Sequence, residues 1–141
     1  MEIMNIKGMV RGAALIFGLL VLNYNVGFSQ LDSASVTLSF TVETDPMDST
    51  QMVDALNIST TVNDIDYLGE VVVTVYDLST GYPVAMVKVS KQEFLDENLV
   101  TGDTALLQLL DIDSASSYRV ETIVRNYQGG QLPTITEEIN N

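Results

Sequence analysis

The chain has 141 residues, of which 6 are basic and 19 acidic, so its formal net charge is −13, and it contains no His and no Cys. Without His the chain lacks the usual general base at neutral pH. Without Cys it can have no thiolate nucleophile, no disulfide and no soft metal ligand. The negative charge repels phosphates and so argues against nucleic acid as a partner.

Residues 1–29 have the organisation of a secretory signal peptide. Lys7 and Arg11 form a positive n-region, an apolar h-region follows at 13–22, and Ser29 is a small residue at the cleavage position. The apolar run is too short to span a bilayer, although an N-terminal anchor that is never cut is the alternative. We predict cleavage after Ser29 or Gln30, and export to the periplasm, the cell surface or the extracellular space.

Cleavage leaves residues 30–141, enough for a single domain with one core. It removes two of the six basic residues and one of the nineteen acidic ones, so the mature chain has four against eighteen, or −14. We expect no membrane insertion of this mature chain.

Strand patterns fill the mature chain. Alternating or β-branched apolar residues predict seven strands, at 36–42, 56–62, 71–76, 84–89, 104–110, 118–125 and 132–139. Segment 91–98 fits either one helical turn or a loop. Strands separated by turns at regular intervals predict an all-β fold, a seven-stranded β-sandwich.

The stretch from Ile112 to Gly129 carries the most specific pattern. Ile112 stands six residues before Tyr118, Val120 follows, and Asn126 and Gly129 come eight and eleven residues after the Tyr. This spacing resembles the end of strand E, the tyrosine corner and strand F of a fibronectin type III domain. Ser replaces the family's usual Pro two residues after Ile112, and no Trp is present for strand B. The resemblance implies an immunoglobulin-like (fibronectin type III-like) β-sandwich.

The sequence contains no catalytic constellation. Without His, a Ser nucleophile would need a Lys base, and the Lys residues lie beside a strand expected to be exposed. The pairs Asp64/Asp66 and Asp111/Asp113 could cleave glycosides only across a cleft, whereas Asp is a preferred turn residue. We therefore predict that the protein is not an enzyme and has no cofactor.

Calcium is a weaker hypothesis for the acidic loops. The candidate ligands are Asn63, Asp64, Asp66, Asp96 and Asp103. No Asp-x-Asp-x-Asp-Gly run is present, so these ligands would have to converge from separate loops. Ordinary solvated acidic loops are the simpler interpretation.

Four Asp-Ser/Thr-small triplets resemble an O-glycosylation acceptor of some Gram-negative exporters. The candidate acceptors are Ser33, Ser49, Thr104 and Ser114. They fall at predicted strand ends or turns, where a sugar can be accommodated. Turn chemistry favours the same residue types, so both interpretations stay open.

We expect a binding or assembly module that docks a protein partner through one exposed sheet face. If Tyr118, Val120 and Val124 point inward, alternation places an apolar and basic patch outward: Tyr76, Met86, Lys88, Arg119, Ile123, Arg125 and Tyr127. Tyr, Met and Arg are enriched at interfaces, although such side chains can also simply cover their own sheet.

Two other functions stay open at this point. The domain could be a structural subunit of a surface filament or appendage that polymerises by strand addition, through an edge strand or Gln30–Ser35. A carbohydrate-binding module is a weaker possibility, because the chain has no Trp for stacking on sugars.

Overall fold

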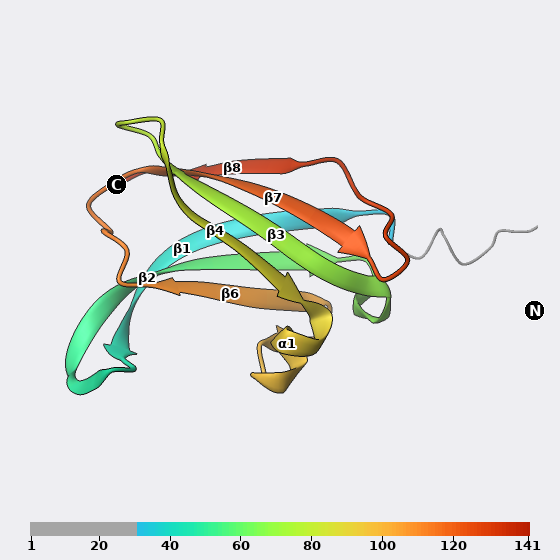
Figure 1. Ribbon diagram of the computed structural model, residues 1–141, viewed down its shortest axis with the longest axis horizontal. Coiled ribbons are helices and arrows are strands. Elements are labelled where there is room, and N and C mark those ends of the chain that lie inside the picture. The colour runs from blue at the N-terminus through green and yellow to red at the C-terminus, as the bar shows by residue number, and fades with distance from the viewer. Residues whose placement is uncertain (1–30) are drawn as a thin grey trace, which may run out of the picture. The chain divides into compact units, whose positions relative to one another are not determined.

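The computed structural model describes residues 31–141, which contain two antiparallel sheets facing each other (Figure 1). One sheet has the strand order β1-β2-β6-β5 and the other β4-β3-β7-β8. The strands are β1 Ala34–Asp45, β2 Asp48–Val62, β3 Leu68–Asp77, β4 Pro83–Ser90, β5 Val100–Thr101, β6 Thr104–Leu110, β7 Tyr118–Asn126 and β8 Ile135–Ile139. The proposed signal peptide lies outside the described residues.

The tyrosine corner joins the two sheets at one end. Tyr118 begins β7, and its Oη donates a hydrogen bond to the backbone oxygen of Asp113, five residues earlier, at 2.9 Å. This corner and the partition of the strands are those of immunoglobulin-like domains. The fold is an immunoglobulin-like β-sandwich, as the sequence predicts. It has eight strands rather than seven, because the two-residue β5 pairs with the start of β6.

The segment after β4 is a short α-helix, α1 (Lys91–Asp96), which settles the choice between helix and loop. Ser90 caps it by accepting a hydrogen bond from the backbone N–H of Glu93 at 3.2 Å. Phe94 is buried on its inner side. The helix therefore connects the two sheets at the end of β4, where Figure 1 shows it.

The β1–β2 hairpin is longer than its pattern predicts. β2 pairs with β6 only from Ala55 to Thr61, whereas its first half pairs with β1 alone. This outer half, the two-stranded ribbon formed by residues 42–54, carries exposed Val42, Met47 and Met52. Because neither of its faces meets a core, it shows no apolar alternation in the sequence.

The core consists of the inward side chains of the central strands, at the positions that alternation predicts. Those with 1% exposure or less include Leu56, Ile58, Val71, Val73, Val75, Val120 and Val124. Val71 and Val124 face each other across β3 and β7, as do Val75 and Val120. The two central strands thus bury one face and leave the other at the surface.

Thr122 is the exception in this core. It is fully buried in β7, and its Oγ1 has no hydrogen-bond partner among residues 31–141. A buried hydroxyl without a partner costs about 1–3 kcal/mol. Replacing it with the similarly shaped Val in Thr122→Val should therefore raise the free energy of unfolding by about 1 kcal/mol, measured by urea denaturation. A destabilised variant would contradict this and indicate a partner for the hydroxyl.

Tyr118 gives a prediction about pH. Burial raises the pKa of its phenol, and the negative charges of Asp113 and Asp77 add to this effect. The pKa of the phenol is higher in the folded protein than its value of about 10 in the unfolded chain. The contribution of neutral Tyr118 to the free energy of unfolding is therefore complete below about pH 10, and it is lost as the pH rises through the folded pKa. Tyr118→Phe should lose about 1 kcal/mol at pH 7 with the corner hydrogen bond.

The measurement is an absorbance titration of the phenolate together with urea denaturation. The wild type should show a component that titrates above pH 10 and is missing from Tyr118→Phe. An unchanged titration in that variant would assign the high pKa to a different tyrosine.

Candidate functional site

The outer face of the sheet β4-β3-β7-β8 collects most of the residues that the sequence singles out. Strand register sets them in rows, since residues directly opposite in an antiparallel pair share a face. Tyr76 lies opposite Arg119, and Val72 lies between Lys88 and Ile123. Met86 lies opposite Thr74, in the row between those of Tyr76 and Val72. We call this surface the outer face.

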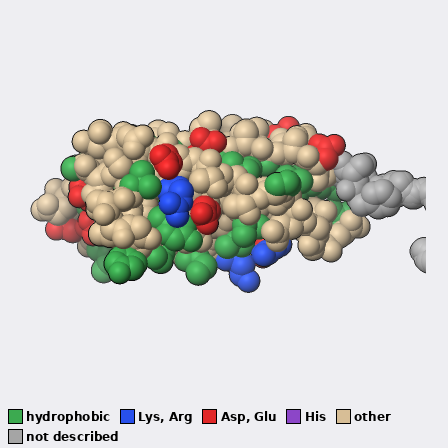
Figure 2. Space-filling model, turned by 90° about the horizontal axis from the view of Figure 1, so that it is seen from above, with side chains coloured by type: hydrophobic (Ala, Val, Ile, Leu, Met, Phe, Trp, Pro, Cys, Tyr) green, Lys and Arg blue, Asp and Glu red, His purple; other side chains and the backbone are tan. Residues whose placement is uncertain are grey.

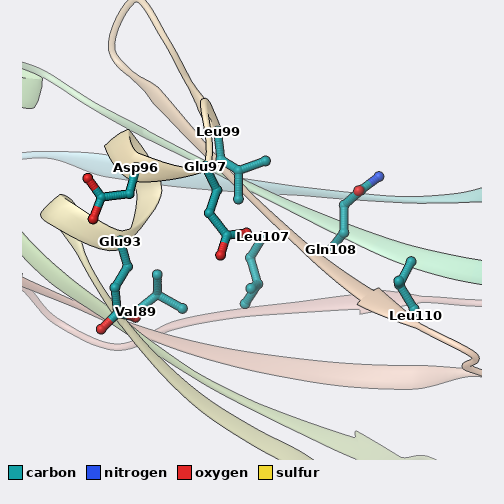
Figure 3. A pocket seen from close by; sticks show the side chains of 8 residues that line it. All are labelled: Val89, Glu93, Asp96, Glu97, Leu99, Leu107, Gln108 and Leu110. Carbon is teal, nitrogen blue, oxygen red and sulfur yellow. The ribbon is translucent and has the colours of Figure 1, made fainter. Parts of the chain in front are cut away.

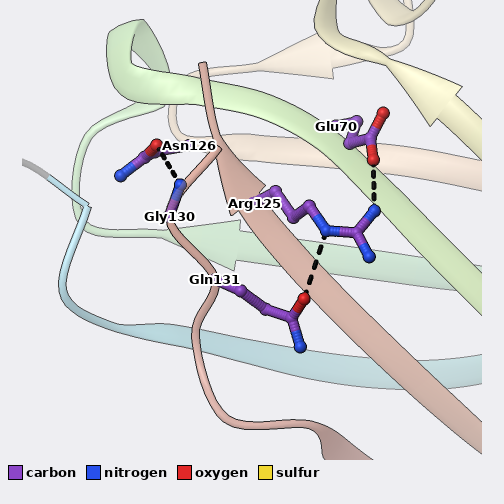
Figure 4. A network of polar contacts seen from close by, with 5 residues as sticks. All are labelled: Glu70, Arg125, Asn126, Gly130 and Gln131. Carbon is purple, nitrogen blue, oxygen red and sulfur yellow. Dashed lines mark hydrogen bonds and ion pairs between the residues drawn. The ribbon is translucent and has the colours of Figure 1, made fainter. Parts of the chain in front are cut away.

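The arginines of the outer face are paired. Arg125 Nη1 contacts Glu70 Oε2 on the neighbouring strand, and its Nε donates a hydrogen bond to Gln131 Oε1 at 3.2 Å (Figure 4). Arg119 Nε lies 3.5 Å from Glu121 Oε2, and its guanidinium carbon lies 4.5 Å from the ring centroid of Tyr76. These contacts fix both side chains against their own sheet.

The basic residues predicted for this face have acidic neighbours on it. Cross-strand register also sets Glu138 opposite Arg119, so three glutamates share the face with its three basic residues. Figure 2 shows basic atoms between acidic ones in the middle of the visible surface. The outer face is close to neutral, on a chain that is strongly acidic elsewhere.

Apolar side chains dominate the β4 side of the outer face. Met86 is 73% exposed and Val84 is 52% exposed, whereas the neighbouring Val72 and Ile123 are half-buried. Hydrophobic side chains gather along one edge of the view in Figure 2, next to basic ones. An edge strand with this much apolar exposure is unusual for a sheet that meets only water.

Tyr127 lies past the end of β7, beside the outer face. Its ring stacks on Tyr67, with centroids 6.0 Å apart and planes at 21°. It lines a shallow hollow together with Glu70 and Arg125. The loop that follows is organised by Asn126, whose Oδ1 accepts a hydrogen bond from the backbone N–H of Gln128. It also accepts one from the backbone N–H of Gly130, which Figure 4 shows.

Sequence reasoning missed several members of this surface. Alternation along β7 puts Glu121 on the same side as Arg119 but does not show that the two side chains pair, and it gives no role to Glu70 or Tyr67. The signal was present in part, because a Glu at the start of a central strand can meet an Arg at the end of its antiparallel neighbour. Only the register identifies which Arg.

The calcium candidates are mostly engaged in turns. Asp64 Oδ1 accepts from the backbone N–H of Asp66, and Asp103 Oδ1 accepts from that of Ile65. Asp96 Oδ1 accepts from Gln92 Nε2, on α1. Among residues 31–141 the acidic side chains make no group of three that could hold a metal ion.

The four candidate glycosylation hydroxyls differ in access. Ser33 and Ser49 are exposed. Ser114 Oγ instead donates to Asp54 Oδ2 at 2.5 Å, and Thr104 Oγ1 shares a 2.7 Å hydrogen bond with Thr61 Oγ1. The first two are the better candidates for modification.

The first described residues, which would begin the chain after the predicted cleavage, are partly engaged. Ala34 and Ser35 pair with Val62 and Thr61 within the same sheet. The backbone N–H groups of residues 32 and 33 donate to Asn63 Oδ1. Addition of the segment Gln30–Ser35 to a neighbour's sheet would have to break these contacts.

Comparison with known proteins adds little to this picture. No protein-family model and no curated protein matches the chain. Among solved structures, it is similar to a DUF3244 family protein with an immunoglobulin-like beta-sandwich fold from Bacteroides vulgatus, at 10% identity and a TM-score of 0.35. That similarity covers 78% of this chain and 99% of the other. Within residues 31–141, the structure contains no helix of the length and apolarity that a membrane crossing requires.

Proposed function

We propose that this protein is an exported, non-catalytic binding module that docks a protein partner through the outer face. The observation that carries the proposal is the combination of exposed Met86 and Val84 with neutralised charge. Interface centres are depleted of unpaired charge and enriched in Met, Tyr and Arg. Export by residues 1–29 is part of the same proposal.

Prior fixation of the arginines supports docking. Arg119 is held over Tyr76, and Arg125 is held by Glu70 and Gln131, so little side-chain entropy remains to be lost on binding. The anchors we assign are Met86, Ile123 and Tyr76, with Tyr127 at the margin. Tyr127 is marginal because it lies past the end of β7, where its ring stacks on Tyr67.

The test compares two double variants in capture of the partner from envelope and medium fractions by cross-linking. Met86→Glu with Ile123→Glu places two carboxylates on the outer face and should abolish capture. The matched control, Val42→Glu with Met52→Glu, makes the same change on the two-stranded ribbon and should leave capture intact. The control pair should melt within a few degrees of the wild type, since exposed substitutions cost about 0.5 kcal/mol or less. The first pair should melt lower, because Ile123 is half-buried, so capture is compared at a temperature at which circular dichroism shows both variants folded.

Capture that survives the first pair but not the second would assign binding to the ribbon and refute the outer face. Loss in both would indicate an effect of added charge alone. A third pair, Met86→Ser with Ile123→Thr, removes apolar area without charge and should still weaken capture at least about tenfold.

A further inference from the structure

A groove lies on the open side of the sandwich, between the edge strands β4 and β6. It consists of two adjacent hollows of about 450 Å³ and 390 Å³, and Gln108 and Leu110 line both. Figure 3 shows the first hollow, with Val89 from β4, Leu107 from β6 and Leu99 beside α1. The floor is apolar because the inward side chains of both sheets reach it.

The β6 edge of this groove is an unfinished sheet. β5 pairs only with Thr104 and Ala105, and the N–H of Leu106 then donates to Leu99 O at 2.8 Å. Among residues 31–141, no strand pairs with that side of β6 farther along. Backbone groups in an antiparallel ladder alternate in direction, so those of Gln108 and Leu110 point into the groove.

The position of the next residue supports this direction. The N–H of Asp111 donates to Asp54 O on β2 at 2.8 Å, so the odd-numbered residues of β6 face β2. The alternation ends there, because the N–H of Ile112 also donates to Asp54 O, at 3.3 Å. β5 is short because the residues that precede it are not extended. They form α1 and the turn at Asn98, which has φ +58°, and so cannot continue the pairing along β6. The backbone of β6 is thus left open next to an apolar floor.

Both ends of the groove are acidic. Glu93, Asp96 and Glu97 line it beside α1. Asp111 and Asp113 line it at the far end, and neither hollow is lined by Lys or Arg. A ligand that fits this groove therefore has positive charge at its ends and apolar side chains between them.

We propose that this groove binds an extended segment of another protein, apolar at alternate positions and flanked by Lys or Arg, which adds to β6 as a strand. Its main chain pairs with Gln108 and Leu110, its alternate side chains contact Leu107 and Val89, and its basic ends meet the two acidic clusters. Main-chain pairing supplies affinity, and the alternate pockets supply specificity. The site shares Val84 with the outer face but none of the anchors assigned there.

A second copy of the chain fits this groove less well. The mature chain carries eighteen acidic residues against four basic ones, so two copies repel each other. The acidic ends of the groove add to that repulsion. A basic partner is attracted by the same charges.

The experiment measures binding of three synthetic peptides to the purified protein by isothermal titration calorimetry. The probe is acetyl-Lys-Lys-Val-Thr-Val-Thr-Val-Lys-Lys-amide. One control replaces both Thr with Pro, which keeps the charge but prevents strand pairing, and the other replaces all Lys with Glu. We expect the probe to bind at least about tenfold more tightly than either control.

A pair of variants tests the position. Leu110→Pro removes an N–H that faces the groove without removing one that bonds β2, and should weaken probe binding about tenfold. Leu110→Ala keeps the N–H and should bind within about threefold of the wild type. Equal binding of the probe and its Pro control, or unchanged affinity in Leu110→Pro, would overturn the proposal.

Hydrogen exchange keeps the test decisive if Leu110→Pro fails to fold. The amides of Gln108 and Leu110 in the wild type should gain protection on addition of the probe, and unchanged protection would overturn the proposal.

A dimer in light scattering that the probe does not displace would assign the edge to a second copy instead. The outer-face variant Met86→Glu with Ile123→Glu should keep probe binding, so failure of one proposal leaves the other standing.

Discussion

Gly69→Ala should destabilise the protein by about 2–3 kcal/mol, because the added methyl group has no space. Gly69 is the additional residue at an irregularity in register between β3 and β7, where Leu68 pairs with Asn126 and Glu70 with Arg125. A Cβ there would lie 2.5 Å from Asn126 O and 2.8 Å from Tyr127 Cα. These are backbone atoms, so the strands themselves would have to separate.

The consequence of Gly69→Ala extends to the outer face. Separation of β3 from β7 at this point disturbs the Arg125–Glu70 pair and the stacking of Tyr67 on Tyr127. The melting temperature should fall by about 10 °C or more in a calorimetric scan. We expect partner capture to weaken too, even where the variant is folded.

Gly81→Asn is the matched control. Gly81 has φ +77° in the β3–β4 turn, and a Cβ placed there meets nothing within 4 Å. Asn tolerates this left-handed conformation, so the cost should be below about 1 kcal/mol. If Gly69→Ala matched this control, the close approach of β7 to Gly69 would be refuted.

Much of the fold could be predicted because one face of each central strand meets the core. Burial on one face alone leaves a period of two, which identifies Val71, Val73 and Val75 on β3 as inward. The same rule fails for the first half of β2, because both of its faces meet water. It also fails for β5, since two residues are too few to show any period.

The helix α1 shows a different limit. Six residues are too few to be helical on intrinsic preference alone, so the outcome depends on tertiary contacts. Ser90 as a cap and Phe94 as the buried residue are visible in the sequence only as ordinary residue types. The helical conformation of Lys91–Asp96 depends on burial of Phe94 at the end of the sandwich.

The candidate site could be predicted in position but not in charge. Alternation correctly put Arg119 and Ile123 on one face, because this depends on a single strand. Whether a basic side chain is paired with an acidic one depends on which residue lies opposite it on the neighbouring strand. That neighbour is set by the register of the two strands. Glu70 lies opposite Arg125 in the same register that pairs Val71 with Val124, and the irregularity at Gly69 begins only beyond this pair. The pattern of one strand does not contain its register with the next.

Phe94→Ala should be the most destabilising single substitution we propose, by about 3–5 kcal/mol. Phe94 is 1% exposed, the largest fully buried side chain in the described residues, and α1 contacts β3, β4 and β6. Truncation leaves a cavity at the end of the core. It also removes the main apolar contact that holds a helix of six residues in place.

The neighbouring Leu95→Ala is the control, because Leu95 is on the same helix but 45% exposed. It should cost about 1 kcal/mol or less in urea denaturation. Phe94→Ala should also speed hydrogen exchange through residues 91–106, since α1 orders the turn from which Leu99 O accepts the N–H of Leu106. Equal effects of the two substitutions would show that α1 lies on the sandwich without closing its end, and the acidic end of the groove would then lack a fixed position.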